Sequence, residues 1–140
     1  METRNHIVSF ACEILSDIKP VVGIDSVIFD IDDTLIDQFG NPMFDVIYLY
    51  LQAKTLGFKI FIITARSGRE ENISRTIVQL EKFGIDGYSQ LYFRHPDNHD
   101  VENYKLVTRQ HIFDTGFNTV MSVGDMPWDI GLYGGVGIII

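Results

Sequence analysis

Residues 27–34 have the sequence Val27-Ile28-Phe29-Asp30-Ile31-Asp32-Asp33-Thr34, an apolar run followed by three carboxylates in four positions. Such acids at the mouth of a buried strand repel one another unless a divalent cation such as Mg²⁺, which takes hard oxygen ligands, offsets the repulsion. On a regular strand Asp30 and Asp32 point to one side and Asp33 points away. One carboxylate is then placed to attack and a second to move protons. The alternative is an acidic turn after the strand, because Asp-Asp-Thr also suits turns and caps.

The composition indicates one globular domain. A chain of 140 residues, 46% hydrophobic and 21% charged, is long enough for one sizeable core, so we expect residues 1–140 to form a single domain. The net charge of −8, without a basic run, argues against extended nucleic-acid binding. One phosphorylated end held in a local basic pocket remains open. Basic residues are concentrated in the middle of the chain, at Arg66, Arg69, Arg75, Arg94, Lys105 and Arg109.

The single cysteine, Cys12, excludes an internal disulfide and fits a reducing compartment. No apolar stretch approaches the roughly 20 residues of a membrane-spanning helix. The first residues lack a strongly basic leader, and Glu13 interrupts the apolar run behind them. The sequence therefore predicts no membrane segment, no signal peptide and a cytoplasmic location.

Predicted strands and helices alternate along the chain. Apolar runs predict strands over 27–31, 58–63, 91–94, 119–123 and 136–140. Helices are expected over 4–18, from Pro42 (capped by Asn41) to Gly57, from a capping box at Ser67–Glu70 to about Phe83, over 102–113 and over 127–132. This alternation implies an α/β fold of three layers, Rossmann-like, with a parallel five-stranded sheet and helices on both faces.

Polar residues follow the predicted strand ends. Asp30–Thr34 follow the first strand, Thr64–Arg66 the second, Arg94 and His95 the third, and Gly124-Asp125 the fourth. Open parallel sheets bind ligands outside the carboxyl ends of their strands. The sequence therefore predicts a functional site at this one edge.

Taken in order, these motifs resemble those of the haloacid dehalogenase (HAD) superfamily, mostly Mg²⁺-dependent phosphatases that work through an aspartyl-phosphate. The family's DxDxT is matched by Asp30–Thr34, and its Thr or Ser at the end of the next strand by Thr64. Its lysine on a later helix is matched by Lys105, and its GDxxxD by Gly124–Asp129. The match covers about residues 27–137.

The resemblance implies a phosphoric monoester hydrolase. Asp30 would be the nucleophile, and Asp32 would be the general acid and base. The family's phosphatases carry this second Asp and its dehalogenases lack it. Thr64 would donate to a phosphoryl oxygen, and Lys105 would hold the nucleophile and balance charge in the transition state.

The resemblance also implies a Mg²⁺ site. Its residues would be Asp30, Asp32 through its backbone carbonyl, Asp125 and Asp129. As an isolated pair, Asp125 and Asp129 also fit acids at a helix N-terminus, where the dipole favours them.

Substrate contacts are expected from Thr34, Ala65, Arg66 and Arg94. Arg66 could clamp a phosphate through its guanidinium fork or pair with a surface acid. A Thr after a strand can also cap a turn, and a Lys on a helix face is commonly solvated.

Both sites of cap insertion in this superfamily are empty here. Only about eight residues separate Thr34 from Pro42, and one helix, one strand and one loop account for 66–105. We therefore expect no cap domain and an open site that admits bulky phosphorylated substrates, unless a second copy of the chain covers it.

Ile62–Arg66, Leu91–Asp100 and Tyr104-Lys105 are similar to the acid phosphatase subgroup, and polynucleotide 3′-phosphatases share this layout. Three hypotheses remain. The first is a Mg²⁺-dependent phosphomonoesterase, favoured because a binding relic tends to lose such costly carboxylates. The second is a phosphate-binding or regulatory protein of the same fold with poor turnover. The third is a nucleic-acid 3′-end phosphatase.

Overall fold

The structure is a computed structural model that describes residues 2–140. Strands and helices alternate as the sequence predicts. In chain order the elements are α1 (Glu2–Asp17), β1 (Asp25–Phe29), α2 (Phe44–Leu56), β2 (Lys59–Ser67), α3 (Glu70–Lys82), β3 (Gln90–Arg94), α4 (Val101–Asp114), β4 (Asn118–Gly124), the 3₁₀ turn η1 (Pro127–Asp129) and β5 (Val136–Ile139).

The five strands form one parallel sheet in the order β3-β2-β1-β4-β5. The chain runs outward from central β1 to β2 and β3, and then crosses back to β4 and β5 on the other side. Because the strand order reverses between β1 and β4, the loops that follow these two strands run to opposite sides and leave a crevice between them. Open α/β sheets bind ligands in this crevice. The fold therefore places Asp30, directly after β1, beside Asp125, directly after β4.

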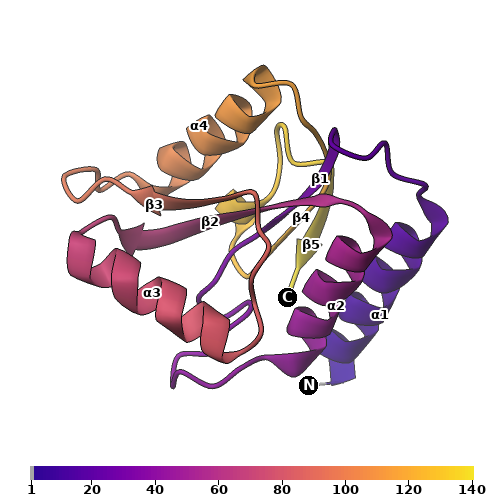
Figure 1. The fold of residues 1–140 in the computed structure, drawn as a ribbon, viewed down its shortest axis with the longest axis horizontal. Helices are drawn as coiled ribbons and strands as arrows, with labels where there is room; N and C mark the ends of the chain where they lie inside the picture. Colours follow the sequence, from indigo (N-terminus) through magenta and orange to yellow (C-terminus); the bar gives the residue numbers. More distant parts are fainter. Residues whose placement is uncertain (1) are drawn as a thin grey trace.

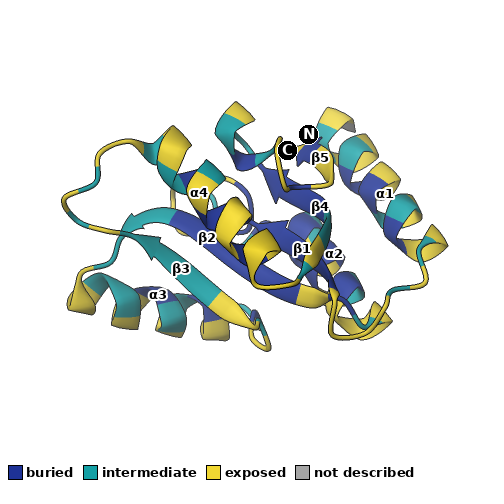
Figure 2. Cartoon of the chain, turned by 90° about the horizontal axis from the view of Figure 1, so that it is seen from above, coloured by how far each residue is buried: buried dark blue, intermediate teal, exposed yellow. Residues whose placement is uncertain are grey.

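Helices cover both faces of the sheet, so the predicted three-layer α/β fold is confirmed (Figure 1). Val27 and Phe29 face the larger core, which α1, α2 and α3 cover, while Ile28 faces a smaller core beneath α4. This split follows from the alternation of side chains along a strand. The central strands are buried on both faces, and edge strand β3 is less so (Figure 2).

The predicted direction of Asp33 is wrong. Strand β1 ends at Phe29, two residues earlier than expected, and the backbone N–H groups of Thr34, Leu35 and Ile36 all donate to the carbonyl of Ile31. This tight turn puts Asp33 at φ 59, in the left-handed region. The alternation of a regular strand therefore no longer applies, and Asp33 lines the same cleft as Asp30.

Two predicted helix starts are also wrong. Helix α2 begins at Phe44 rather than Pro42, because Pro42 pairs with Ile36 in an isolated bridge and Asn41 caps nothing. Helix α3 begins at Glu70 without a side-chain cap, because Ser67 still belongs to β2. The predicted 127–132 helix is only the 3₁₀ turn η1.

The predicted ends of α2 and α3 agree better with the structure. Gly57 ends α2 in the left-handed conformation, at φ 101. Helix α3 ends at Lys82, one residue before the predicted Phe83.

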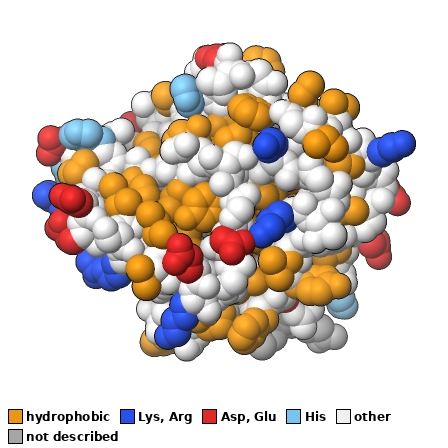
Figure 3. Space-filling view, viewed as in Figure 1, with side chains coloured by type: hydrophobic (Ala, Val, Ile, Leu, Met, Phe, Trp, Pro, Cys, Tyr) orange, Lys and Arg blue, Asp and Glu red, His pale blue; other side chains and the backbone are white. Residues whose placement is uncertain are grey.

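No cap domain is present in residues 2–140. Between Thr34 and β2 lie only a loop and α2, and between β2 and α4 lie only α3, β3 and their loops. Charged side chains on the face shown in Figure 3 are scattered among apolar ones rather than gathered into a basic stripe. Among the described helices, none has both the length and the apolar character of a membrane span.

Candidate active site

A cleft of about 250 Å³ opens at the carboxyl ends of the central strands. Its walls come from the loops after β1 and β4, from β2 near its carboxyl end and from the start of α4. The lining residues are Asp30, Asp32, Asp33, Ala65, Val101, Lys105, Asp125, Met126 and Trp128. Five residues of the predicted site, from four separate segments of the sequence, thus meet in one cavity: Asp30, Asp32, Ala65, Lys105 and Asp125.

Asp30 is fixed at the floor of this cleft. Its backbone N–H donates to the carbonyl of Val123 at 3.0 Å, which ties it to β4 just beyond the end of β1. Its side chain is only 9% exposed, and its Oδ1 accepts a hydrogen bond from Lys105 Nζ at 2.9 Å. Thr34 Oγ1 donates a longer bond of 3.4 Å to the other oxygen. The carboxylate therefore has a single fixed position.

Lys105 is buried rather than solvated. Its Nζ lies 2.9 Å from Asp30 Oδ1 and 2.8 Å from Asp129 Oδ1, and it donates to the carbonyl of Ile63 at 2.7 Å. A buried ammonium group needs such oxygen partners to offset the loss of hydration. Lys105 therefore joins α4 to the ends of β1 and β2 and to η1.

Three carboxylates share this end of the sheet. Oxygen atoms of Asp30, Asp125 and Asp129 all lie within 4.8 Å of one another. The carboxylate of Asp129 is held by the N–H of Met126, which donates to Oδ2 at 3.0 Å. Its Oδ1 is buried and accepts no hydrogen bond from the described residues. Lys105 Nζ is close enough, at 2.8 Å, but the angle of approach does not suit a hydrogen bond.

The glycine of the GDxxxD motif has a steric role. A Cβ built on Gly124 would lie 2.2 Å from Cβ of Asp129 and 2.4 Å from its Oδ2. No larger residue fits there unless Asp129 moves. Gly124 is therefore required for the loop to fold Asp129 back onto the end of β4.

The cluster contains three carboxyl groups and one lysine. Burial raises the pKa of Asp30 to about 7, against the lowering effect of Lys105, and the nearby charge of Asp129 raises it further. Burial also raises the pKa of Asp125, and a hydrogen bond with Asp30 partly opposes this rise. One lysine thus does not compensate three neighbouring carboxylates.

Asp32 lies apart from this cluster and pairs with Arg66. Its two oxygens accept hydrogen bonds from Arg66 Nη2 at 2.8 Å and Nε at 3.0 Å, a bidentate geometry. The side chain of Asp32 is 53% exposed, so a bound molecule can reach it. Of the two alternatives for Arg66, a phosphate clamp or a partner of an acid, the structure contains the second.

Thr64, Ala65 and Arg94 come together around the end of β2. Thr64 is buried, and its Oγ1 accepts the backbone N–H of Arg66 at 3.1 Å, as a turn-capping Thr would. The guanidinium of Arg94 donates to the carbonyls of Ala65, His95 and Asn98. Arg94 therefore braces the loop beside the cleft and is not among its lining residues.

Comparison with known proteins places this arrangement in a family. Residues 41–133 match the family described as HAD superfamily, subfamily IIIB (acid phosphatase). The chain belongs to this subfamily. The match extends over more than half of the chain, and it begins after Asp30–Thr34. Family membership is therefore decided by the later motifs, while the assignment of Asp30 depends on its geometry.

Individual relatives of this HAD protein agree with that result. Acid phosphatase 1 of Solanum lycopersicum is 28% identical over 136 residues, which cover 77% of this chain and 52% of the relative. The chain thus spans about half the length of that relative. A chain in the solved structure of the Pnkp1/Rnl/Hen1 complex has a similar fold, with a TM-score of 0.72 and 18% identity over 84% of this chain and 46% of its own length.

The acidic cluster of this HAD protein fits a divalent cation. It offers three carboxylates as hard oxygen donors, including a buried oxygen of Asp129 without a hydrogen bond, and it has an excess of negative charge. Asp30, Asp125 and Asp129 are therefore the side chains that would hold Mg²⁺. Asp32 was predicted to bind the metal through its backbone carbonyl, and its side chain is outside this group and pairs with Arg66.

Arg109 is a functional candidate that sequence reasoning missed. It is 3% exposed, and it donates to the carbonyls of Trp128 at 2.7 Å and Leu132 at 2.9 Å. These bonds fix the loop that carries Asp125 and Asp129. The sequence spacing could have identified Arg109, since it lies four residues after Lys105 and thus on the same face of α4.

Tyr104 was also not singled out as a site residue. Its hydroxyl is buried and has no hydrogen-bond partner among the residues that the structure describes. Burial raises the pKa of Tyr104, and the nearby carboxylate of Asp30 raises it further. Tyr104 therefore remains neutral beside Asp30.

Proposed function

We propose that this chain is a Mg²⁺-dependent phosphomonoesterase that works through a covalent aspartyl-phosphate on Asp30. The observation that carries the proposal is the buried Asp30 carboxylate, held by Lys105 at the floor of an open cleft and joined to an acidic cluster that fits a cation. Membership of an acid phosphatase subfamily supports the same reaction class.

In the first step, an oxygen of Asp30 attacks the phosphorus of the substrate, and the bond from phosphorus to the ester oxygen breaks. The leaving alkoxide takes a proton from Asp32, which the partly exposed position of this residue allows. In the second step, a water oxygen attacks the same phosphorus while Asp32 takes a proton from that water. The bond from phosphorus to Asp30 then breaks, and inorganic phosphate is released.

Asp32 must change partners during this cycle. In the structure it is a carboxylate paired with Arg66, and a proton on Asp32 weakens that pair. Arg66 therefore holds Asp32 at the mouth of the cleft while it is charged, and the pair opens when Asp32 takes up a proton.

Lys105 and Thr64 supply fixed donors around the nucleophile. The ammonium of Lys105 keeps Asp30 in place and counters the charge that builds up on the phosphoryl oxygens. The hydroxyl of Thr64 accepts a hydrogen bond from Arg66 N, so its own proton remains available to a phosphoryl oxygen. When bound by Asp30, Asp125 and Asp129, Mg²⁺ supplies the positive charge that screens repulsion between an anionic nucleophile and an anionic phosphate.

The second candidate is a phosphate-binding protein of the same fold that turns over poorly. Asp30, Asp32, Thr64 and Lys105 are all present in or beside one cleft, which favours the enzyme. The cleft is uncapped in the described chain, and this supports bulky phosphorylated substrates.

Phosphate release from an aryl phosphate, mononucleotides and a 3′-phosphorylated oligonucleotide tests the proposal, with Mg²⁺ and with a chelator. We expect Asp30→Asn to lower kcat by at least about 10³-fold while circular dichroism shows an unchanged fold, since the amide is nearly isosteric but not nucleophilic. A rate near that of the wild type would exclude Asp30 as the nucleophile. A folded wild-type protein that binds phosphate without turnover would support the second candidate.

A further inference from the structure

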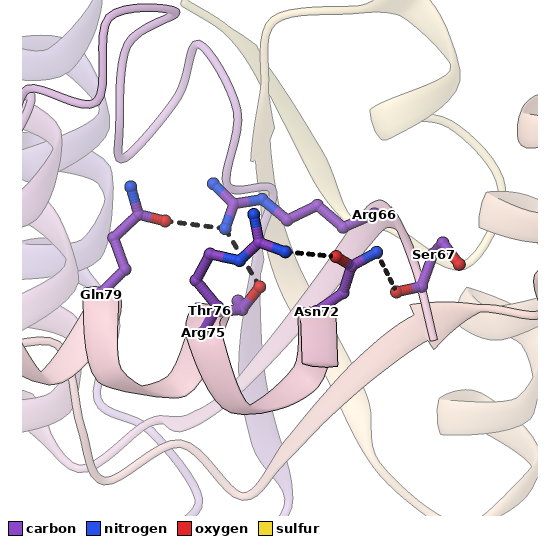
Figure 4. Close-up of a pocket in the computed structure, with 6 residues that line it drawn as sticks. All are labelled: Arg66, Ser67, Asn72, Arg75, Thr76 and Gln79. Carbon is purple, nitrogen blue, oxygen red and sulfur yellow. Dashed lines mark hydrogen bonds between the residues drawn. The ribbon is translucent and has the colours of Figure 1, made fainter. Parts of the chain in front are cut away.

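A second cavity, of about 360 Å³, lies between the end of β2 and helix α3. We call it the Arg75 pocket. It adjoins the cleft, because Arg66 lines it and also pairs with Asp32, and because Ala65, the preceding residue, lines the cleft. Figure 4 shows its lining side chains, which are Arg66, Ser67, Asn72, Arg75, Thr76 and Gln79.

The two arginines of the pocket differ in how many donors they have left. Four of the five N–H donors of Arg66 are engaged, two by Asp32, one by Thr76 and one by Gln79. Arg75 donates one hydrogen bond, to Asn72 Oδ1 at 3.0 Å, and pairs with no carboxylate among the described residues. Most of its guanidinium is therefore free to bind a ligand.

The pocket is a local basic feature of an acidic protein. The chain has a net charge of −8, yet no acidic residue in the described part of the chain lines this cavity. The amide side chains of the pocket orient its arginines: Asn72 accepts from Arg75, and Gln79 accepts from Arg66 and keeps its amide N–H₂ group. Free guanidinium donors with amide neighbours match the oxygens of a phosphoryl group.

We propose that the Arg75 pocket binds a second phosphoryl group, carried by the leaving alcohol of the substrate. This inference is based on the proposed function, since it places the scissile phosphate at Asp30. The preferred substrates are then phosphomonoesters with a second phosphate or phosphodiester nearby. A nucleoside 3′,5′-bisphosphate and the 3′-phosphorylated end of an oligonucleotide share this chemistry.

The test measures binding by calorimetry in an Asp30→Asn background, so that turnover plays no part. The ligands are adenosine 3′,5′-bisphosphate and adenosine 3′-monophosphate at low salt. We expect the bisphosphate to bind about tenfold more tightly than the monophosphate. Its second phosphoryl group adds hydrogen bonds to a charged guanidinium, and such bonds are stronger than neutral ones. Adding Arg75→Gln should remove most of this difference.

Lys82→Gln is the matched control. It removes one positive charge from the same helix, but Lys82 lies at the far end of α3 and does not line the pocket. It should leave the ratio of the two affinities unchanged. Equal binding of the two adenosine phosphates, no detectable binding of the bisphosphate, or equal effects of Arg75→Gln and Lys82→Gln would overturn the inference.

A 3′-phosphorylated pentanucleotide distinguishes the two sources of the second phosphate. Binding tighter than that of the bisphosphate identifies a nucleic-acid end, and weaker binding identifies a small bisphosphate; both support the pocket. The turnover assay on wild-type protein is separate. If the wild-type protein turns over none of the substrates but the ratio of affinities is as expected, the proposed phosphatase activity is refuted. The proposed binding of a phosphoryl group by the Arg75 pocket is then still supported.

Discussion

The acidic cluster around Lys105 and the Arg75 pocket lie at neighbouring strand ends, but they are built differently. Lys105 is 3% exposed in its side chain and has three oxygen partners, whereas Arg75 is exposed and donates a single hydrogen bond. In the first region, Lys105 and Asp30 are held in one position by their contacts. The second retains free donors toward solvent. The proposed nucleophile is thus held among buried groups, whereas the proposed recognition of a second phosphate depends on donors that are still free to bind.

Removing Lys105 should have the largest effect, because it leaves the carboxylates of Asp30 and Asp129 buried without their cation. We expect Lys105→Met to lower the free energy of unfolding by about 3 kcal/mol and kcat by about 10³-fold. Urea unfolding and phosphate release measure the two effects.

Lys54→Met is the control for this prediction. Lys54 pairs with Asp86 at 2.7 Å, but both side chains are well exposed, so its loss should cost less than about 1 kcal/mol. Similar losses of stability in the two variants would show that the burial of Lys105 is not what matters.

Arg66 joins the two regions, and its replacement should have an intermediate effect. With Arg66→Gln, Asp32 loses its bidentate partner and is no longer held at the cleft. We expect a roughly tenfold lower kcat for alkyl phosphates and a smaller loss for an aryl phosphate, whose good leaving group needs less help from an acid.

Arg69→Gln serves as the control, since Arg69 is exposed and lines neither cavity. It should change neither rate. An equal loss on alkyl and aryl phosphates in Arg66→Gln would show that Arg66 does not act through Asp32.

Much of the fold could be predicted from the sequence, for local reasons. Apolar runs ending in polar residues mark the strands, and their alternation with helices requires a parallel sheet with helices on both faces. Because carboxyl ends of parallel strands share one edge, Asp30, Thr64 and Asp125 could be expected to lie together. The order of the motifs then led to the correct superfamily and subfamily.

The errors came from contacts that local patterns do not contain. Ser67 and Asn41 have the sequence of helix caps, but β2 extends through Ser67, and the bridge between Ile36 and Pro42 delays α2. The pair between Asp32 and Arg66 joins residues 34 positions apart, and it forms only when β1 and β2 lie side by side. Such contacts depend on tertiary geometry and therefore appear only in the structure.

The smallest expected effect is a pH dependence of stability in the metal-free protein. In the fold the pKa of Asp30 is raised to about 7, mainly by burial, from an ordinary value of 3.8. Between these values the folded state keeps a proton that the unfolded state has lost, so stability falls as pH rises through this window.

The amide of the Asp30→Asn variant has no such proton to lose. The excess Tm of Asp30→Asn should therefore be near zero at pH 4 and grow as pH rises to about 7, and Mg²⁺ should reduce it by stabilising the wild type. Asp37→Asn gives the opposite sign, because the N–H groups of Asn41 and Phe39 lower the pKa of Asp37. Its deficit in Tm should be present above the ordinary pKa and should vanish as pH falls through the lowered pKa of Asp37. Scanning calorimetry with a chelator measures both differences. A pH-independent difference for Asp30→Asn would mean that Lys105 alone neutralises the cluster, and that the buried region does not require a second cation.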